Sequence, residues 1–517
     1  MKNIAITCFV LIAVCVGLQA KKVVKAPYFM ATNTSQIEFE KVTLGKDTTW
    51  IDAKIYSIPG EDVRIDSTAV LQIGGKTYAR RRTAASNPAA QLAGKPGPAA
   101  FGELAVTLKF KPIPMDTESF DFFEMSEKKD EGWNIYGVRL DGKKPEIGIP
   151  EKLLNQQLDY SQPLPDPDLK NGKTVIYGRI LGYDPTHGIA LKFNCTDWLF
   201  FDVFGQSVPV VEDGSFRYET NMMLPGEATL RVGRKRFELF LMPGGKLEVT
   251  INLPEIFWSE SHLFGKKENG QLIWFEGTYA ALNTELVKHA GLMNIYSADN
   301  FYENICGVTP AQYKKYVTKI YEKNRGEILK NKSLSDAART YMINKLEMSY
   351  FFAIRGYKGN ISYAPMISGK KGVKRADMTV DESYYDDILE LDFIHSPYIR
   401  YGSYPDFVRA ATEDFKGKFE PQPVWEDILR AKPLGSTLAR LKPLSEKQML
   451  TLDSISEPEI KKALTVKNKE VMDLLAESVN KTGYTVCQLD TAVTADGLLA
   501  VVTRPYRGKV VLIDMWN

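Results

Sequence analysis

The stretch Thr49-Trp-Ile-Asp-Ala-Lys-Ile-Tyr56 decides the class of fold in the first part of the chain. Its apolar and polar residues alternate, which is typical of a β-strand with one buried and one solvated face. Ile37-Glu-Phe-Glu-Lys-Val42 and Ala105-Val-Thr-Leu-Lys-Phe-Lys111 repeat this pattern, and no helical period interrupts them. Several short strands joined by turns predict an antiparallel, β-sandwich-like domain over residues 26–150.

A second β unit is predicted over residues 169–253. Its first strand is Thr174-Val-Ile-Tyr-Gly-Arg-Ile-Leu-Gly-Tyr183. Glu212-Asp-Gly-Ser-Phe216 contains an Asp-Gly turn between two strands, and Pro243-Gly-Gly245 marks a second turn. We therefore expect another small antiparallel β-sandwich.

The hydrophobic period changes to that of α-helices over residues 275–480. The clearest helix is predicted between Leu334 and Tyr357, and Thr309 is a suitable N-cap for a helix that begins at Pro310. We interpret this region as helical, with aromatic stripes that form its core and no cofactor site. Its shorter helical patterns lie at Tyr384–Phe393, Pro405–Phe415, Val424–Leu429, Leu434–Leu441, Ser445–Leu452 and Glu457–Val479.

Length and charge limit the classes of function. The chain has 517 residues, and because domains usually run to roughly 100–200 residues, we expect a multi-domain α+β protein. Lys and Arg (66) nearly balance Asp and Glu (64), which leaves a formal net charge of +2. No overall field therefore steers the chain to nucleic acid or to anionic lipid.

Residues 1–20 have the features of a signal peptide. Lys2 precedes an apolar run from Ile4 to Leu18, and Ala20 supplies a small residue at the cleavage site. The run is too short to span a bilayer comfortably, and a retained membrane anchor is the alternative. No later stretch is long and apolar enough for a membrane-spanning helix. We therefore expect an exported protein of the periplasm or cell envelope, with no stable membrane span after cleavage.

The sequence contains no complete catalytic or metal site of a common kind. It has no Cys-x-x-Cys, His-Glu-x-x-His or Gly-x-Ser-x-Gly motif, so we predict no metal and no cofactor. Three cysteines follow the signal, Cys195, Cys306 and Cys487, and their wide spacing favours free thiols. Asp386 and Asp387 are neighbours on a predicted helix, where adjacent side chains diverge, so a solvated face is favoured over an acid–base pair.

The end of the chain resembles a known family. Arg507-Gly-Lys-Val-Val-Leu-Ile-Asp-Met-Trp-Asn517 is similar to the beginning of TlpA-like thioredoxin domains, which belong to exported thiol–disulfide oxidoreductases. That family shows Gly-Lys, an apolar strand, Asp, an aromatic pair and then Trp-Cys-x-x-Cys, and Met515 stands where its members usually have Phe. Larger members also carry β-sandwich regions and a helical segment before this domain, as predicted here.

The resemblance implies both a chemistry and its missing residues. In the family, the first cysteine attacks a substrate disulfide and the second resolves the mixed disulfide. Both would fall a few positions beyond Asn517, and Cys487 has no partner at the required spacing. Asp514 matches the family's buried Asp, which assists proton transfer to the resolving cysteine. Residues 483–517 are therefore expected to be the truncated start of a thioredoxin-like α/β domain whose partners would be protein thiols and disulfides.

Two functions stay open. One is the non-catalytic N-terminal portion of an envelope thiol–disulfide oxidoreductase, whose β and helical domains position or select protein substrates. The other is an envelope binding or interaction protein that uses its β-sandwich domains and carries a vestigial thioredoxin-like tail. The apolar run from Val510 to Ile513 would be an uncovered, aggregation-prone strand, which favours an interrupted reading frame over a working end. The DNA that follows codon 517 distinguishes the two.

Overall fold

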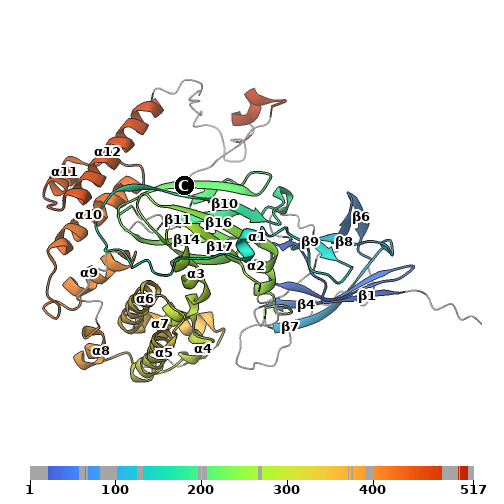
Figure 1. Cartoon of the computed structure of the whole chain (residues 1–517), viewed down its shortest axis with the longest axis horizontal. Coiled ribbons are helices and arrows are strands. Elements are labelled where there is room, and N and C mark those ends of the chain that lie inside the picture. Colours follow the sequence, from blue (N-terminus) through green and yellow to red (C-terminus); the bar gives the residue numbers. More distant parts are fainter. Residues whose placement is uncertain are drawn as a thin grey trace, which may run out of the picture.

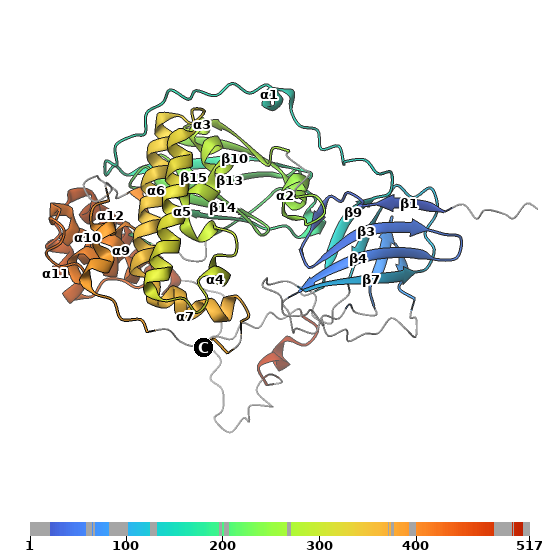
Figure 2. The same cartoon turned by 90° about the horizontal axis from the view of Figure 1, so that it is seen from below.

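The computed structural model, seen from two directions in Figures 1 and 2, confirms the predicted order of a β-rich half and a mainly helical half. The predicted signal peptide, Cys487 and the strand that contains Asp514 lie outside the described residues. The structure describes residues 21–57, 65, 68–81, 102–124, 132–195, 199–200, 206–265, 270–370, 372–373, 377–391, 400–479, 499 and 501–509.

The first β unit has two antiparallel sheets that enclose one core. Their strand orders are β1-β3-β4-β7 and β2-β9-β8-β5-β6. Phe39 of the first sheet packs edge-on against Phe122 of the second, with ring centres 5.3 Å apart. The strands are β1 (Lys22–Lys25), β2 (Ala31–Thr32), β3 (Ile37–Leu44), β4 (Thr49–Ser57), β5 (Val70–Ile73), β6 (Lys76–Ala79), β7 (Gly102–Phe110), β8 (Ser119–Phe123) and β9 (Asn134–Arg139).

One hairpin of this unit is absent from the strands predicted from sequence. β5 and β6 pair in antiparallel fashion around Gly74 and Gly75. Both glycines have positive φ, 52° and 80°, as a two-residue hairpin turn of this hand requires. The Gly-Gly dipeptide is therefore the sequence signal that identifies the hairpin.

The second β unit also places two sheets around one core, with strand orders β13-β10-β16-β17 and β12-β11-β14-β15. β10 pairs antiparallel with β13 but parallel with β16, so the unit predicted to be antiparallel contains one parallel pair of strands. The turn at Pro243–Gly245 leads from β15 in one sheet to β16 in the other, and does not close a hairpin. The strands are β10 (Gly172–Leu181), β11 (Leu191–Cys195), β12 (Gln206–Val208), β13 (Ser215–Met222), β14 (Gly226–Val232), β15 (Lys235–Leu241), β16 (Lys246–Asn252) and β17 (Ile273–Gly277), with α1 (Glu151–Leu154) before them and α2 (Leu253–Glu260) between β16 and β17.

The helical region packs around one core, to which Phe240 of the second β unit also contributes, and one of its helices begins at the predicted cap Thr309. Thr309 caps α5 in a reciprocal capping box with Gln312, and Pro310 is the first helical residue. Ser335 caps α6, which ends before Gly356. The helices are α3 (Ala280–Lys288), α4 (Phe301–Asn304), α5 (Pro310–Lys330), α6 (Asp336–Arg355), α7 (Tyr357–Ile367), α8 (Asp386–Leu389), α9 (Tyr404–Glu413), α10 (Pro423–Ala439), α11 (Glu446–Asp453) and α12 (Pro458–Val479).

Helix α10 corrects the prediction of two separate helices at Val424–Leu429 and Leu434–Leu441. The structure has one continuous helix with Pro433 inside it. Proline lacks an N–H and crowds the carbonyl one turn earlier, which normally interrupts a helix. Here the residues on both sides of Pro433 are buried on one core face, and this burial stabilises the continuous helix.

The second β unit lies between the first β unit and the helical region in both views (Figures 1 and 2). On the helical side, the amide of Asn283 in α3 donates to the Phe240 carbonyl (2.9 Å) and accepts from the Phe240 N–H (2.7 Å). Glu227 of β14 pairs with Lys345 of α6 and accepts from the Gly402 N–H at 3.0 Å. These bonds fix the helical region against the sheet.

Candidate functional site

The residues singled out from the sequence do not meet in one site. Asp514 and Cys487 lie outside the described residues. Cys195 lies in β11 beside the core of the second β unit, whereas Cys306 packs against the helical core. Within the described part of the chain, these two cysteines belong to different units and form no pair for thiol exchange.

The described residues also show no metal cluster. No group of three or more His, Cys, Asp or Glu side chains among them could hold an ion. Asp386 and Asp387 begin α8 with both side chains exposed, which confirms the prediction of a solvated face. Across the same described ranges, no helix is long and apolar enough to cross a membrane.

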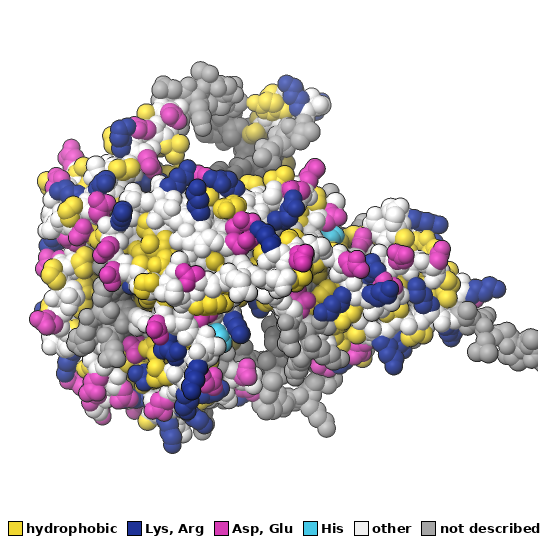
Figure 3. Space-filling model, in the orientation of Figure 1, with side chains coloured by type: hydrophobic (Ala, Val, Ile, Leu, Met, Phe, Trp, Pro, Cys, Tyr) yellow, Lys and Arg dark blue, Asp and Glu magenta, His cyan; other side chains and the backbone are white. Residues whose placement is uncertain are grey.

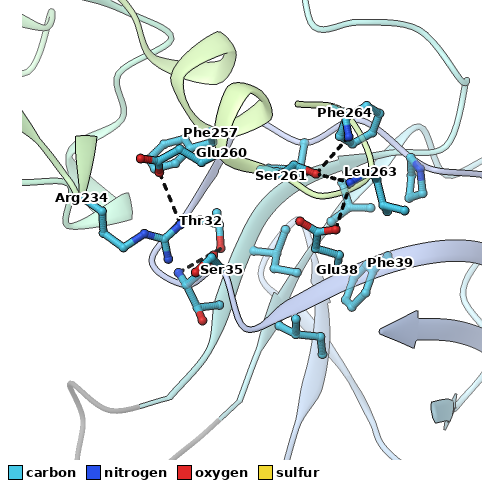
Figure 4. Close-up of a pocket in the computed structure, with 16 residues that line it drawn as sticks. Thr32, Ser35, Glu38, Phe39, Arg234, Phe257, Glu260, Ser261, Leu263 and Phe264 are labelled. Atoms are coloured by element: carbon cyan, nitrogen blue, oxygen red, sulfur yellow. Dashed lines mark hydrogen bonds and ion pairs between the residues drawn. The ribbon is translucent and has the colours of Figure 1, made fainter. Parts of the chain in front are cut away.

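A small cavity lies at the junction of the two β units (Figure 4). Its open volume is ≈ 20 Å³, about the space of a single water molecule. Thr32 of the first unit lies near Arg234 of the second, which pairs with Glu260 at 3.5 Å, whereas Glu38 of the first unit points toward Leu263 of the second. The cavity is too small for a substrate, and we interpret it as part of a structural junction.

Glu38 is the central polar group of this junction. Its buried carboxylate accepts hydrogen bonds from the N–H groups of His262 (2.7 Å) and Leu263 (3.2 Å), both in the loop after α2. The ring of His262 stacks on Tyr56 of β4, with centres 4.0 Å apart. Burial, together with the negative charge of Glu38, raises the pKa of Tyr56 above its usual range. Glu38 therefore docks the second β unit onto the first.

A second histidine lies at the same junction. His187, in the short 3₁₀ helix η1 (Pro185–His187), stacks on Tyr136 of β9 with ring centres 4.2 Å apart. Its Nε2 lies 3.9 Å from Asp184, and within the described part of the chain its buried Nδ1 has no hydrogen-bond partner. Burial lowers the pKa of His187, an effect that Asp184 and Asp121 oppose. The neutral ring is the form that fits this contact.

An open groove lies between α5 and the segment 377–387, with a volume of ≈ 910 Å³. The α5 bank is mainly cationic, although Glu322 also lines it, and the opposite bank is anionic; Lys314 of α5 joins the two through an ion pair with Asp387 at 3.1 Å. Figure 3 shows the same mixture of cationic and anionic side chains over the lower part of the helical region. The cations on the α5 bank are Lys314, Lys315 and Lys319, and the anions on the other bank are Asp377, Asp381 and Asp387.

Tyr384 is the aromatic residue of this groove. Its side chain is buried, its hydroxyl has no hydrogen-bond partner among the residues that the structure describes, and the Nζ of Lys314 lies 5.5 Å from its ring centre. Burial and the neighbouring Tyr357 and Tyr385 raise its pKa, so the hydroxyl is neutral at physiological pH. Thr318, on the α5 bank, shares a 2.8 Å hydrogen bond with Tyr350.

The groove presents charged groups of both signs to a ligand. Facing banks of ammonium and carboxylate groups would pair with an extended polypeptide that carries acidic and basic side chains. The lining residues that the structure describes include neither cysteine nor histidine. We interpret it as a binding surface.

The sequence analysis did not identify this groove. The lysines of α5 lie in a stretch correctly predicted as helical. Their spacing along that helix could therefore have indicated one charged bank of the groove. The opposite bank follows about fifty residues later in the chain, and a periodic pattern does not say which distant segment packs beside it.

Comparison with known proteins adds no relative. No family model, curated protein or solved structure matches this chain. The function is therefore argued from the chain's own residues.

Proposed function

We propose that this chain is the non-catalytic N-terminal portion of an envelope thiol–disulfide oxidoreductase of the TlpA-like kind. The observation that carries the proposal is the motif from Gly508 to Trp516, where Gly-Lys, an apolar strand, Asp514 and Trp516 follow in the family's order. A thioredoxin-like domain would begin near residue 483, and its redox cysteines would follow Asn517. Export through the predicted signal peptide would place it in a compartment where disulfides form.

The two β units, proposed as β-sandwich domains, and the helical region would position protein substrates. The buried bonds of Glu38 and Asn283 support this role, because they tie the three parts into one framework. A framework of this kind holds a bound substrate at a defined distance from a tethered catalytic domain, which raises the effective concentration of the two reacting groups.

The groove beside α5 would bind the substrate polypeptide. Its charged banks favour an extended segment of a partly unfolded protein, the form in which backbone and side chains are both accessible. A disulfide reductase acts on such chains, since buried disulfides in compact proteins are protected from attack. The groove would therefore select substrates by conformation and charge.

The test is reduction of insulin disulfides by the product of the locus, read through and beyond codon 517. We expect turnover that disappears when the first cysteine of Cys-x-x-Cys is replaced by Ser. Lys315→Glu combined with Lys319→Glu should lower kcat/KM for a protein substrate by roughly tenfold, because it reverses one bank of the groove. Lys323→Glu on the same helix, outside the groove, is the matched control and should change little. The proposal would be rejected if the product of the locus does not reduce insulin, or if its activity persists after the cysteine is replaced.

A second candidate is an envelope binding protein with a vestigial tail. The groove favours it, because ≈ 910 Å³ is room for a peptide without any redox domain. The junction of the β units gives this second function less support, because the cavity there has a volume of only ≈ 20 Å³ and is too small for a peptide. Peptide binding by a locus product that stops at codon 517, abolished by the double lysine reversal, would support this function instead.

A further inference from the structure

Helix α5, which runs beside α6 in Figure 2, presents two lysines to the groove at a fixed spacing. Lys315 and Lys319 lie one turn apart on the face of α5 that lines the groove, and both are exposed. Among the described residues, the ion pairs of α5 use Lys314 and Lys323, and they leave Lys315 and Lys319 without an anionic partner. Because an α-helix rises by about 1.5 Å per residue, these two lysines are separated by about 6 Å along the helix axis.

The bank opposite α5 offers carboxylates and unused backbone groups. Asp377 and Asp381 are exposed and lie at the two ends of a short segment that is neither helix nor strand. Their carboxylates accept hydrogen bonds from the hydroxyls of Thr379 and Ser383, which position them without neutralising their charge. Between them, Val380 forms no hydrogen bond to a described residue through its N–H or its carbonyl. This bank therefore offers a polypeptide both negative charge and backbone groups with which its own backbone can pair.

The spacing of the two lysines matches that of side chains on an extended polypeptide. In an extended chain each residue advances by about 3.3 Å, and successive side chains point to opposite sides. Residues i and i+2 therefore lie on the same side and about 6.6 Å apart, close to the separation of Lys315 and Lys319 along α5. Two acidic residues at i and i+2 can pair with both lysines at once, while the residues at i+1 and i+3 face the carboxylates of the other bank.

We propose that the groove recognises extended polypeptide segments in which acidic and basic residues alternate. The acidic residues would pair with Lys315 and Lys319, and the intervening basic residues would pair with Asp377 and Asp381. A segment with two acidic and then two basic residues would place one residue of the wrong sign on each bank, because neighbouring side chains point to opposite sides. Glu322, which follows Lys319 on the α5 bank, limits the acidic positions to two and favours a basic residue at the next one.

Selection by alternating charge is also selection by conformation. In a helix the same acidic and basic side chains project around the axis, so they do not separate onto two sides. The groove would therefore bind the segment only where the substrate protein is extended. This selectivity rests on the binding role proposed for the groove, and it uses no redox cysteine, so it can be measured on the chain that ends at Asn517.

Fluorescence anisotropy with two labelled peptides of identical composition tests the proposal on the full chain. One peptide carries Glu-Lys-Glu-Lys between flanks of Gly and Ser, and the other carries Glu-Glu-Lys-Lys between the same flanks. We expect the alternating peptide to bind roughly tenfold more tightly at low salt, and the difference to shrink at high salt, where charges are screened. Equal affinities would overturn the charge pattern, and no binding of either peptide would overturn the binding role of the groove as well. Neither result affects insulin reduction by the longer product of the locus, so failure of the redox proposal is measured separately.

Charge reversal on α5 locates the recognition in the groove. With Lys319→Glu, each peptide makes one unfavourable contact, so the preference should fall from roughly tenfold to less than about twofold. Lys323→Glu, on the same helix but outside the groove, is the matched control and should keep the full preference. Both side chains are exposed, so neither substitution disturbs the core. A preference that is unchanged in Lys319→Glu, or that is lost equally in both variants, would overturn the proposal.

Discussion

Among single residues, Asp427 of α10 joins two distant parts of the helical region. Its buried carboxylate accepts hydrogen bonds from the N–H of Ser456 (3.0 Å) and from the N–H of Glu457 (2.8 Å), just before α12 begins. Asp427→Ala should lower the free energy of unfolding by about 2–3 kcal/mol, because it leaves these donors unsatisfied. Urea unfolding followed by circular dichroism measures the change.

The neighbouring Glu426 provides the control for this substitution. Its side chain is exposed and pairs with Arg430 at the surface, so Glu426→Ala should cost less than about 0.5 kcal/mol. Asp427→Asn keeps one acceptor oxygen and should fall between the two. An Asp427→Ala protein as stable as Glu426→Ala would show that the carboxylate does not anchor α12.

His187 makes the junction of the β units sensitive to pH. Its folded-state pKa is lowered from 6.5 by burial, so the folded protein resists protonation. Its contribution to stability is therefore present above about pH 6.5 and is lost as the pH falls through the folded-state value, with a limiting slope of about 1.4 kcal/mol per pH unit.

His187→Phe keeps the stack on Tyr136 and removes the titrating group. The variant should lose less stability than the wild type between pH 7.5 and pH 5, as measured by urea unfolding at each pH. Subtraction of the two profiles cancels the other histidines. Identical profiles, or a steeper loss in the variant, would contradict the assignment.

The role of a residue could be predicted from the sequence where its partner is nearby in the chain, but not where its partner is distant in the chain. Thr309 was identified as a cap because a cap acts within one turn of its own helix. Asp427 and the loop at Ser456 are separated by about thirty residues, and Glu38 and His262 by more than two hundred. Nothing in the spacing of these residues indicates that they meet.

Among elements, Asn283 shows how a helix covers the edge of a sheet. β15 ends the order β12-β11-β14-β15, and the Asn283 amide bonds both backbone groups of Phe240 as a neighbouring strand would. Asn283→Leu should lower the free energy of unfolding by about 2–4 kcal/mol, because it leaves a buried N–H and a buried carbonyl without partners. Denaturant unfolding tests this, with Thr284→Ala as the adjacent control. A stable Asn283→Leu protein would refute the edge role.

Helices and strands with a regular pattern of apolar residues were predicted well from the sequence. The way in which strands pair with one another was not. β4 and α6 follow their alternating and helical patterns closely. The parallel pair β10–β16 was missed because direction depends on how the chain crosses between sheets, which neither strand encodes. α10 was divided in two because proline weakens a helix locally, whereas the core that holds it together is contributed by other elements.

At the scale of the whole molecule, the framework and the tail motif support one account. The β units and the helical region are joined by buried bonds, and α12 precedes in sequence the segment that resembles the start of a thioredoxin-like domain. The groove beside α5 could not be predicted from sequence, because it exists only where two distant segments pack together. The resemblance at residues 507–517 is visible in the sequence because its residues are contiguous, and it stays a prediction.

The most direct test of this account is to read the reading frame of the locus through and beyond codon 517. The account predicts that the frame continues from Trp516-Asn517 into a Cys-x-x-Cys pair within a few codons, followed by the remainder of a thioredoxin-like domain. A stop codon directly after Asn517 in independent isolates would contradict it, and the groove would then be the place to search for a bound partner.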